Sequence, residues 1–252
     1  MNEIDPNFWL GYLSEWLGVI AVVMIAGISP MFKKIRRIEF RYPRRDATFA
    51  LILFAVIFFF AFMFFTNPLF ESLRDFAGAF PGGEYSQRMF VALIAIVLVV
   101  ILLIVRGQPP KSTGWSKDNT RANITLAVML VILVVFLRGK FYTLLGGITP
   151  EQGSLLLVMI VWCLLEETIF RGYIQLRLMS FLGTTWGWLA TSLLYVLWQL
   201  PGNPVFTSFA TEWPSLVIAL VQGLLLGWIM RKTYHVAAPA FLRAVATWLM
   251  LL

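Results

Sequence analysis

Runs of apolar residues long enough to cross a membrane constrain this chain more than any other feature of its sequence. Its 252 residues contain about eight such runs, and 60% of all residues are hydrophobic, against about 45–50% in soluble domains. A helix of roughly 20 apolar residues spans the bilayer and satisfies its backbone hydrogen bonds internally. We therefore predict an all-α, polytopic membrane protein that forms a single membrane domain over residues 1–252. The predicted spans are residues 8–32, 48–66, 89–105, 122–137, 153–179, 184–200, 214–230 and 235–252.

The Lys and Arg residues follow the predicted membrane topology. A net charge of +7 is compatible with nucleic-acid binding, but fifteen of the twenty basic residues fall in alternate loops. Four others, Arg74, Arg88, Arg138 and Lys140, lie on the opposite side. The positive-inside rule places the fifteen in the cytoplasm and both termini outside. Topology alone explains the basic segment 33–45, although such a segment can also attract anionic lipid headgroups. We expect membrane lipids as general partners and no nucleic-acid partner. The basic loops are residues 33–45, 106–121, 171–177 and 231–232.

A polar loop separates two unlike parts of the chain. Pro109 and Pro110 open this loop, which continues to Asn119. The transmembrane helices predicted within residues 1–121 are almost purely apolar, whereas residues 151–252 contain several ionisable and amide side chains inside apolar runs. We therefore expect any chemistry to lie in the C-terminal half.

Three local patterns predict smaller features. Large apolar residues recur every three or four positions in the outer loop 67–88, which predicts an amphipathic helix on the outer surface. Thr149 followed by Pro150 predicts an N-cap and first helical residue for the fifth span. Glu15 lies beside two tryptophans near the outer end of the first span, where we expect it to be solvated.

The C-terminal half carries ionisable side chains at membrane depth. Glu166 and Glu167 are followed by Arg171 within an apolar run. On a helix Glu167 and Arg171 share a face and can pair, while Glu166 is rotated by about 100° and can meet a different neighbour. Arg243 lies inside the last apolar run, where an unpaired arginine costs at least about 2.5–3.5 kcal/mol, so it needs a partner.

Helix geometry predicts that several of these side chains meet. At 1.5 Å per residue, Glu166, Gln199 and Arg243 lie roughly 13–20 Å from the cytoplasmic ends of their helices. We therefore expect one shared site. Tyr195 and Trp198, on the same helix as Gln199, are expected either in the core or in the wall of a substrate or ligand cavity.

Cysteine and histidine, the other residue types that often act as nucleophiles or metal ligands, each occur once in the chain. The one cysteine, Cys163, lies one turn before the two glutamates, and we assign it a packing role rather than that of a nucleophile. The one histidine, His235, is expected near the membrane interface rather than as a ligand. With so few ligands of these types, we predict no bound metal and no other cofactor.

The motifs of residues 151–252 resemble those of the CAAX prenyl protease and bacteriocin-processing (CPBP) family of intramembrane glutamic peptidases. Glu166, Glu167 and Arg171 match the first family motif, Glu-Glu-x-x-x-Arg. The second, Phe-x-x-x-His, corresponds to the run from Tyr195 to Gln199, and the third, His-x-x-x-Asn, to Arg243 and Thr247. The resemblance implies a CPBP-like helical core in which both motif histidines are replaced.

These replacements bear on the chemistry that the resemblance implies. In active members the first glutamate and a histidine activate a water, while the other histidine and the asparagine stabilise the oxyanion or help hold a metal. Gln199 can donate a hydrogen bond but cannot exchange protons, and Arg243 is a permanent cation that holds a carboxylate ionised. With Arg171 and Arg243 facing two glutamates, the buried charges sum to zero, which favours a structural core.

Three functional hypotheses remain. The first is a non-proteolytic CPBP-family membrane protein that acts as an accessory or scaffold subunit of a membrane complex, or binds a lipid or peptide in the former active-site cavity. The second is an active intramembrane peptidase that cleaves lipidated CAAX-type or leader peptides, using Glu166 with Gln199 and Arg243 as oxyanion donors. The third is a transporter or channel, which the apolar N-terminal half disfavours. We expect the protein in a bacterial cytoplasmic membrane.

Overall fold

The computed structural model describes residues 6–33, 35, 37–203 and 209–252, and within them it contains helices and no strands. This confirms the predicted all-α class. The helices are α1 (Pro6–Ile28), α2 (Pro30–Lys33), α3 (Pro43–Thr66), η1 (Pro68–Phe70), α4 (Glu71–Gly78), α5 (Glu84–Val105), η2 (Pro110–Thr113), α6 (Lys117–Leu137), α7 (Phe141–Leu145), α8 (Pro150–Glu167), η3 (Thr168–Gln175), α9 (Leu176–Leu182), α10 (Thr184–Trp198), α11 (Phe209–Thr233) and α12 (Ala237–Leu249).

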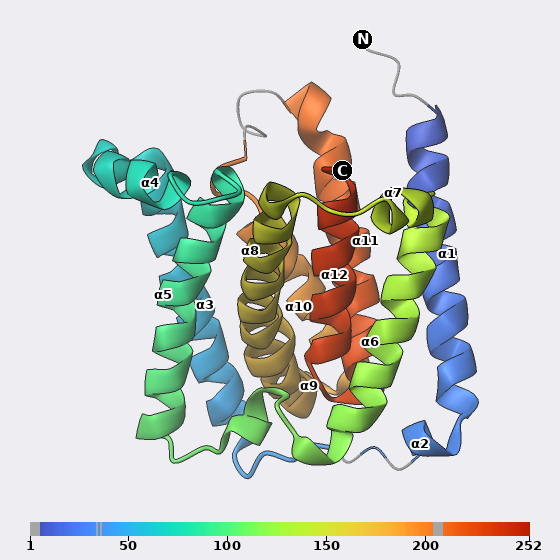
Figure 1. Cartoon of the computed structure of the whole chain (residues 1–252). Coiled ribbons are helices and arrows are strands. Elements are labelled where there is room, and N and C mark those ends of the chain that lie inside the picture. The colour runs from blue at the N-terminus through green and yellow to red at the C-terminus, as the bar shows by residue number, and fades with distance from the viewer. Residues whose placement is uncertain (1–5, 34, 36, 204–208) are drawn as a thin grey trace.

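The long helices run side by side and form one bundle (Figure 1). Six helical segments of the described chain are long and apolar enough to cross a membrane. The two remaining predicted spans correspond to α10 and α12, which are shorter, with 15 and 13 residues. Helix α12 packs between α6 and α8, so most of its surface faces protein rather than lipid. The six spans support an integral membrane protein.

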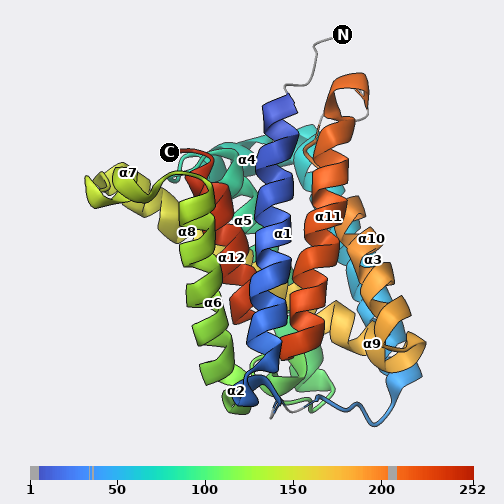
Figure 2. The same ribbon diagram turned by 90° about the vertical axis from the view of Figure 1, so that its right-hand side faces the viewer.

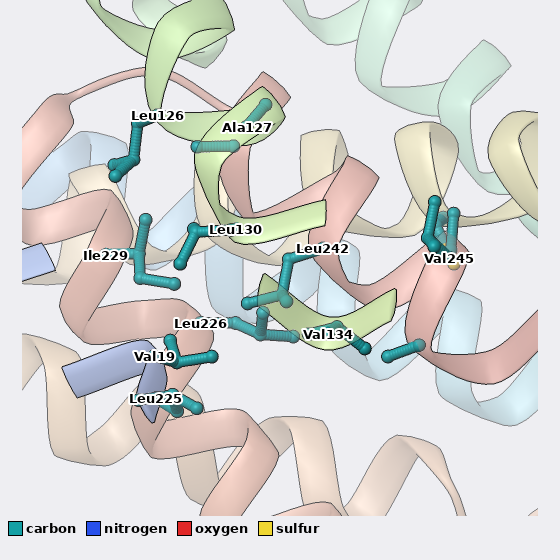
Figure 3. Close-up of a cluster of buried hydrophobic side chains, with 14 of the residues drawn as sticks. Val19, Leu126, Ala127, Leu130, Val134, Leu225, Leu226, Ile229, Leu242 and Val245 are labelled. Atoms are coloured by element: carbon teal, nitrogen blue, oxygen red, sulfur yellow. The ribbon is translucent and has the colours of Figure 1, made fainter. Parts of the chain in front are cut away.

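Two apolar cores lie within the bundle. The first joins α1, α6, α8, α11 and α12, and Figure 3 shows Leu130, Ile229 and Leu242 meeting within it. The second joins α3, α5, η3 and α10 around rings such as Phe64 and Phe170. The continuous helical segment 150–182 contributes to both cores, with Cys163 in the first and Phe170 in the second. Polar residues between these two positions therefore lie at the junction of the cores.

Short helices cover one end of the bundle. Helix α4 forms within the loop predicted to be amphipathic, and it lies across the end of the bundle together with α7 (Figure 1). Gly82 and Gly83 then turn the chain with φ angles of 103° and 53°, which residues other than glycine rarely adopt. The start of α1 and the end of α12 lie at this same end (Figures 1 and 2).

The opposite end carries most of the basic loops. Residues 37–42, which precede α3, run across this end beneath the bundle (Figure 2). Lys34 and Arg36 of the predicted basic segment lie outside the described residues. One part of the loop assignment was wrong. Arg171 and Arg177 lie within the continuous helical segment 150–182 and are fully buried, because their side chains find partners inside the protein.

A second prediction to be corrected concerns Glu15. Its side chain is buried rather than solvated, because α6 ends beside it and brings Arg138 within reach. Arg138 Nη2 lies 2.6 Å from Glu15 Oε2, and Arg138 Nε donates to the same oxygen at 2.7 Å. The pair attaches α1, which stands at the right-hand edge of the bundle in Figure 1, to the end of α6.

Candidate functional site

The helical segment 150–182 positions the ionisable side chains of the candidate site. Its start is fixed by a capping box, in which Thr149 Oγ1 accepts from the backbone N–H of Gln152 and Gln152 Oε1 accepts from the backbone N–H of Thr149. The N-cap predicted from the sequence is therefore confirmed. From Thr168 to Gln175 the helix widens to a π-helix, a form that often occurs at functional sites.

Glu167 and Arg171 form an ion pair within this helix. Arg171 Nε lies 3.1 Å from Glu167 Oε2, and both side chains are fully buried. The pairing expected from their spacing of four residues is present. Arg171 lies in the π-helical turns, and its guanidinium carbon lies 4.6 Å from the centre of the Tyr195 ring of α10.

Arg243 of α12 connects to both glutamates. Its Nη1 lies 2.6 Å from Glu166 Oε2 and 3.3 Å from Glu167 Oε1. The partner that this buried arginine requires is therefore the adjacent pair of carboxylates. Two carboxylates and two guanidinium groups meet, and their formal charges sum to zero. We call Glu166, Glu167, Arg171 and Arg243 the Glu–Arg cluster.

Aromatic rings enclose the Glu–Arg cluster. Trp198 Nε1 donates to Glu166 Oε1 at 2.8 Å. The rings of Tyr195 and Trp162 lie 5.2 and 4.6 Å from Arg243 Cζ, within the range of cation–π attraction. Tyr195 and Trp198 thus lie beside the cluster, and their role in lining a ligand cavity stays a prediction, whereas Trp162 was not predicted. Its signal was its position four residues before Glu166, which places both on one helix face.

The Glu–Arg cluster is closed to its surroundings. Glu167 and Arg171 have no exposed surface, Glu166 is 1% exposed, and Arg243, the most exposed of the four, is 5% exposed. Because the cluster lies between two apolar cores, its ionic groups interact in a medium of low polarity. Each charge therefore depends on its partners for stabilisation.

Two predicted site residues do not join the cluster through hydrogen bonds of the described chain. Gln199 follows the last residue of α10, and its Oε1 accepts from Arg88 Nη1 at 3.5 Å. Its buried Nε2 has no partner among the described residues. Thr247 lies one turn beyond Arg243 on α12, and the described residues provide no hydrogen bond between its side chain and the cluster.

The other reactive side chains lie apart from any metal-binding arrangement. The described residues contain no group of three or more His, Cys, Asp or Glu side chains that could hold a metal ion. The absence of a metal or other cofactor remains a prediction. Cys163 is fully buried in the first apolar core. His235 is also buried, between α11 and α12, where its Nδ1 accepts from the backbone N–H of Ala237 at 3.1 Å.

The fold and the site define a polytopic helical membrane protein with an ion-paired Glu–Arg cluster between its helices. Residues 151–249, which contain the whole cluster, match the family model of the Rce1-like type II CAAX prenyl endopeptidases. This match confirms the resemblance predicted from the motifs of residues 151–252. No curated protein and no solved structure matches the chain.

Proposed function

We propose that this protein is a non-proteolytic member of the CAAX-protease type that acts as an accessory or scaffold subunit of a membrane complex. The observation that carries the proposal is the position of Arg243, which pairs with both glutamates through one nitrogen. In this role the Glu–Arg cluster holds α8, η3 and α12 together rather than activating a water.

The state of the carboxylate oxygens supports this proposal. Trp198 and Arg243 contact the two oxygens of Glu166, while Arg243 and Arg171 contact the two oxygens of Glu167. A general base needs a carboxylate oxygen that can reach a water molecule, and all four carboxylate oxygens here already contact a side chain of the cluster or Trp198. Neither glutamate is therefore arranged to activate a water.

Closure of the cluster favours the scaffold role over ligand binding at the same place. A lipid or peptide that entered between Glu166 and Trp198 would have to break their 2.8 Å hydrogen bond and expose buried ion pairs. A scaffold role requires no such opening. A second version of the proposal is that the protein binds a lipid or peptide at the position of the former active-site cavity.

The alternative function is intramembrane peptidase activity, and cleavage experiments distinguish it. Full-length protein in lipid nanodiscs is incubated with a farnesylated CAAX-type peptide and with a leader-type peptide, and the Glu166→Gln variant is the control. We expect neither protein to cleave above background. Cleavage by the wild type that is lost in Glu166→Gln would overturn the proposal.

The accessory role is tested by the native mass of the protein after gentle extraction from its own membrane. We expect a stoichiometric complex with another membrane protein. A second extraction of the Arg243→Gln variant shows whether the complex depends on the cluster's packing. A free monomer in the wild-type sample would contradict the scaffold role and favour the alternative function, intramembrane peptidase activity.

A further inference from the structure

A cavity lies at the start of α3, at the end of the bundle opposite α4 and α7 (Figure 1). Its volume is about 520 Å³, and it is separate from the Glu–Arg cluster. Both polar and apolar side chains line it. The lining residues are Arg41, Tyr42, Pro43, Arg44, Arg45, Thr48, Phe49 and Ile52.

The polar part of this cavity is strongly cationic. Arg41, Arg44 and Arg45 are exposed, and the guanidinium carbons of Arg41 and Arg45 lie 5.3 and 5.6 Å from the centre of the same Tyr42 ring. Among the described residues, no carboxylate lines the cavity. The acid of this turn, Asp46, is buried and accepts from Arg106 Nη2 at 2.7 Å. Three clustered cations therefore favour an anionic ligand.

The other part of the cavity is apolar and continues along α3. Ile52 lines the cavity and is 54% exposed. Val56 and Phe59 follow it at intervals of four and three residues and are 50% and 64% exposed, so the three side chains form one stripe. On a membrane-spanning helix such a stripe faces the hydrocarbon chains of lipids.

From this arrangement we propose that the cavity binds an anionic phospholipid. Its phosphodiester headgroup lies among Arg41, Arg44 and Arg45, and an acyl chain lies along Ile52, Val56 and Phe59. Arginine forms paired hydrogen bonds with phosphate oxygens, and the stripe excludes water from the acyl chain. The site does not depend on the proposed function, because no residue of the Glu–Arg cluster lines it.

Lipid titration with native mass spectrometry tests the site on the full-length protein. Phosphatidylglycerol and phosphatidylcholine with identical acyl chains serve as probes. We expect phosphatidylglycerol to bind preferentially, and the triple variant Arg41→Gln/Arg44→Gln/Arg45→Gln to weaken its binding by about tenfold to a hundredfold. The matched control is Lys111→Gln/Lys117→Gln/Arg121→Gln, which removes three exposed charges near the same end and should leave binding unchanged.

Two further arms separate a lipid from a free anion. Ile52→Ser keeps all three arginines and is expected to weaken phosphatidylglycerol binding, because it interrupts the apolar stripe. Inorganic phosphate at the same concentration is expected not to displace the lipid. Unchanged binding in the arginine triple variant, equal loss in the control variant, or displacement by phosphate would each overturn the proposal.

Discussion

Charge balance determines what the individual residues of the Glu–Arg cluster contribute. Removing ions from water costs several kcal/mol per ion, and mutual attraction repays this cost only where partners are close and complete. Here the partners are close but not complete. Arg243 Nη1 lies 2.6 Å from Glu166 Oε2 and Glu167 lies between two guanidinium groups, whereas Nη1 and Nη2 of Arg171 have no hydrogen-bond partner among the described residues. The loss of one member therefore leaves a buried charge without compensation.

A charge-balance experiment on Glu166 and Arg243 follows from this arrangement. The Glu166→Gln variant leaves two arginines facing one glutamate, and we expect it to lose about 3–5 kcal/mol of stability. The double variant Glu166→Gln/Arg243→Gln keeps the neutral Glu167–Arg171 pair, so most of the loss should be recovered. Thermal unfolding in one detergent measures both. A catalytic Glu166 without a structural role would instead give a single variant as stable as the wild type.

His235 is predicted to make stability depend on pH. Burial lowers the pKa of His235 to about 4, from an ordinary value of 6.5. Since Nδ1 accepts from Ala237, the neutral ring carries its proton on Nε2, which lies 3.3 Å from Thr120 Oγ1. Between pH 6.5 and 4 the unfolded chain binds a proton that the folded chain does not, so stability falls as the pH falls through this window.

The measurement is the unfolding temperature of wild type and His235→Asn between pH 4 and 8. Asparagine can still accept from the N–H of Ala237 through its side-chain oxygen but does not titrate in this range. We expect a flatter pH profile for the variant. Parallel profiles for the two proteins would show that other groups carry the dependence.

At the scale of elements, the π-helical segment η3 is held against the loop that precedes α6. Trp115 Nε1 donates to Thr168 Oγ1 at 3.1 Å, and Arg177 of α9, two residues after η3, donates through Nη1 to the backbone carbonyl of Ser112 at 3.1 Å. Gly172 permits this approach, because a Cβ there would lie 2.1 Å from the carbonyl oxygen of Thr113. The glycine after Arg171 therefore has a packing role in this fold.

The Gly172→Ala substitution should separate these two elements. The clash is with backbone atoms, which cannot rotate away, so we expect a loss of about 1–3 kcal/mol or more. The matched control is Gly153→Ala in α8, whose Cβ would meet its nearest atom at 4.0 Å and should gain about 0.5–1 kcal/mol from helix propensity. Protease accessibility of the loop and unfolding temperature check both. Equal stability of the two variants would contradict the close approach.

At the scale of the whole molecule, local signals predicted the helices but not all their contacts. Hydropathy indicates the spans because each must satisfy its own backbone in lipid, and Thr149 with Pro150 indicates where α8 begins. The burial of Glu15 depends on Arg138, which lies 123 residues further along the chain, so no local pattern reveals it. The π-helical turns of η3 were likewise not predicted from the sequence.

The candidate site was predictable to a similar degree. The spacing of Glu167 and Arg171 indicates their pair, and the cost of an isolated Arg243 indicates that a partner exists. Which side chain pairs with Arg243 could not be predicted, because this depends on how each helix is rotated about its own axis. The predicted depth of Gln199 in the membrane equals that of Glu166, which is why we expected the two side chains to meet. In the structure, however, the neighbouring Trp198 at the end of α10 donates to the Glu166 carboxylate.

Membrane orientation is the remaining prediction at this scale, and it follows from the basic loops at one end of the bundle. We expect this end in the cytoplasm. Lys111→Cys, in η2 at the basic end, and Tyr142→Cys, in α7 at the other, place a thiol at exposed positions. A membrane-impermeant maleimide should label Tyr142→Cys in intact cells and Lys111→Cys only after permeabilisation. The wild type is the control, because its one cysteine, Cys163, is fully buried. The reverse labelling pattern would place the basic loops outside.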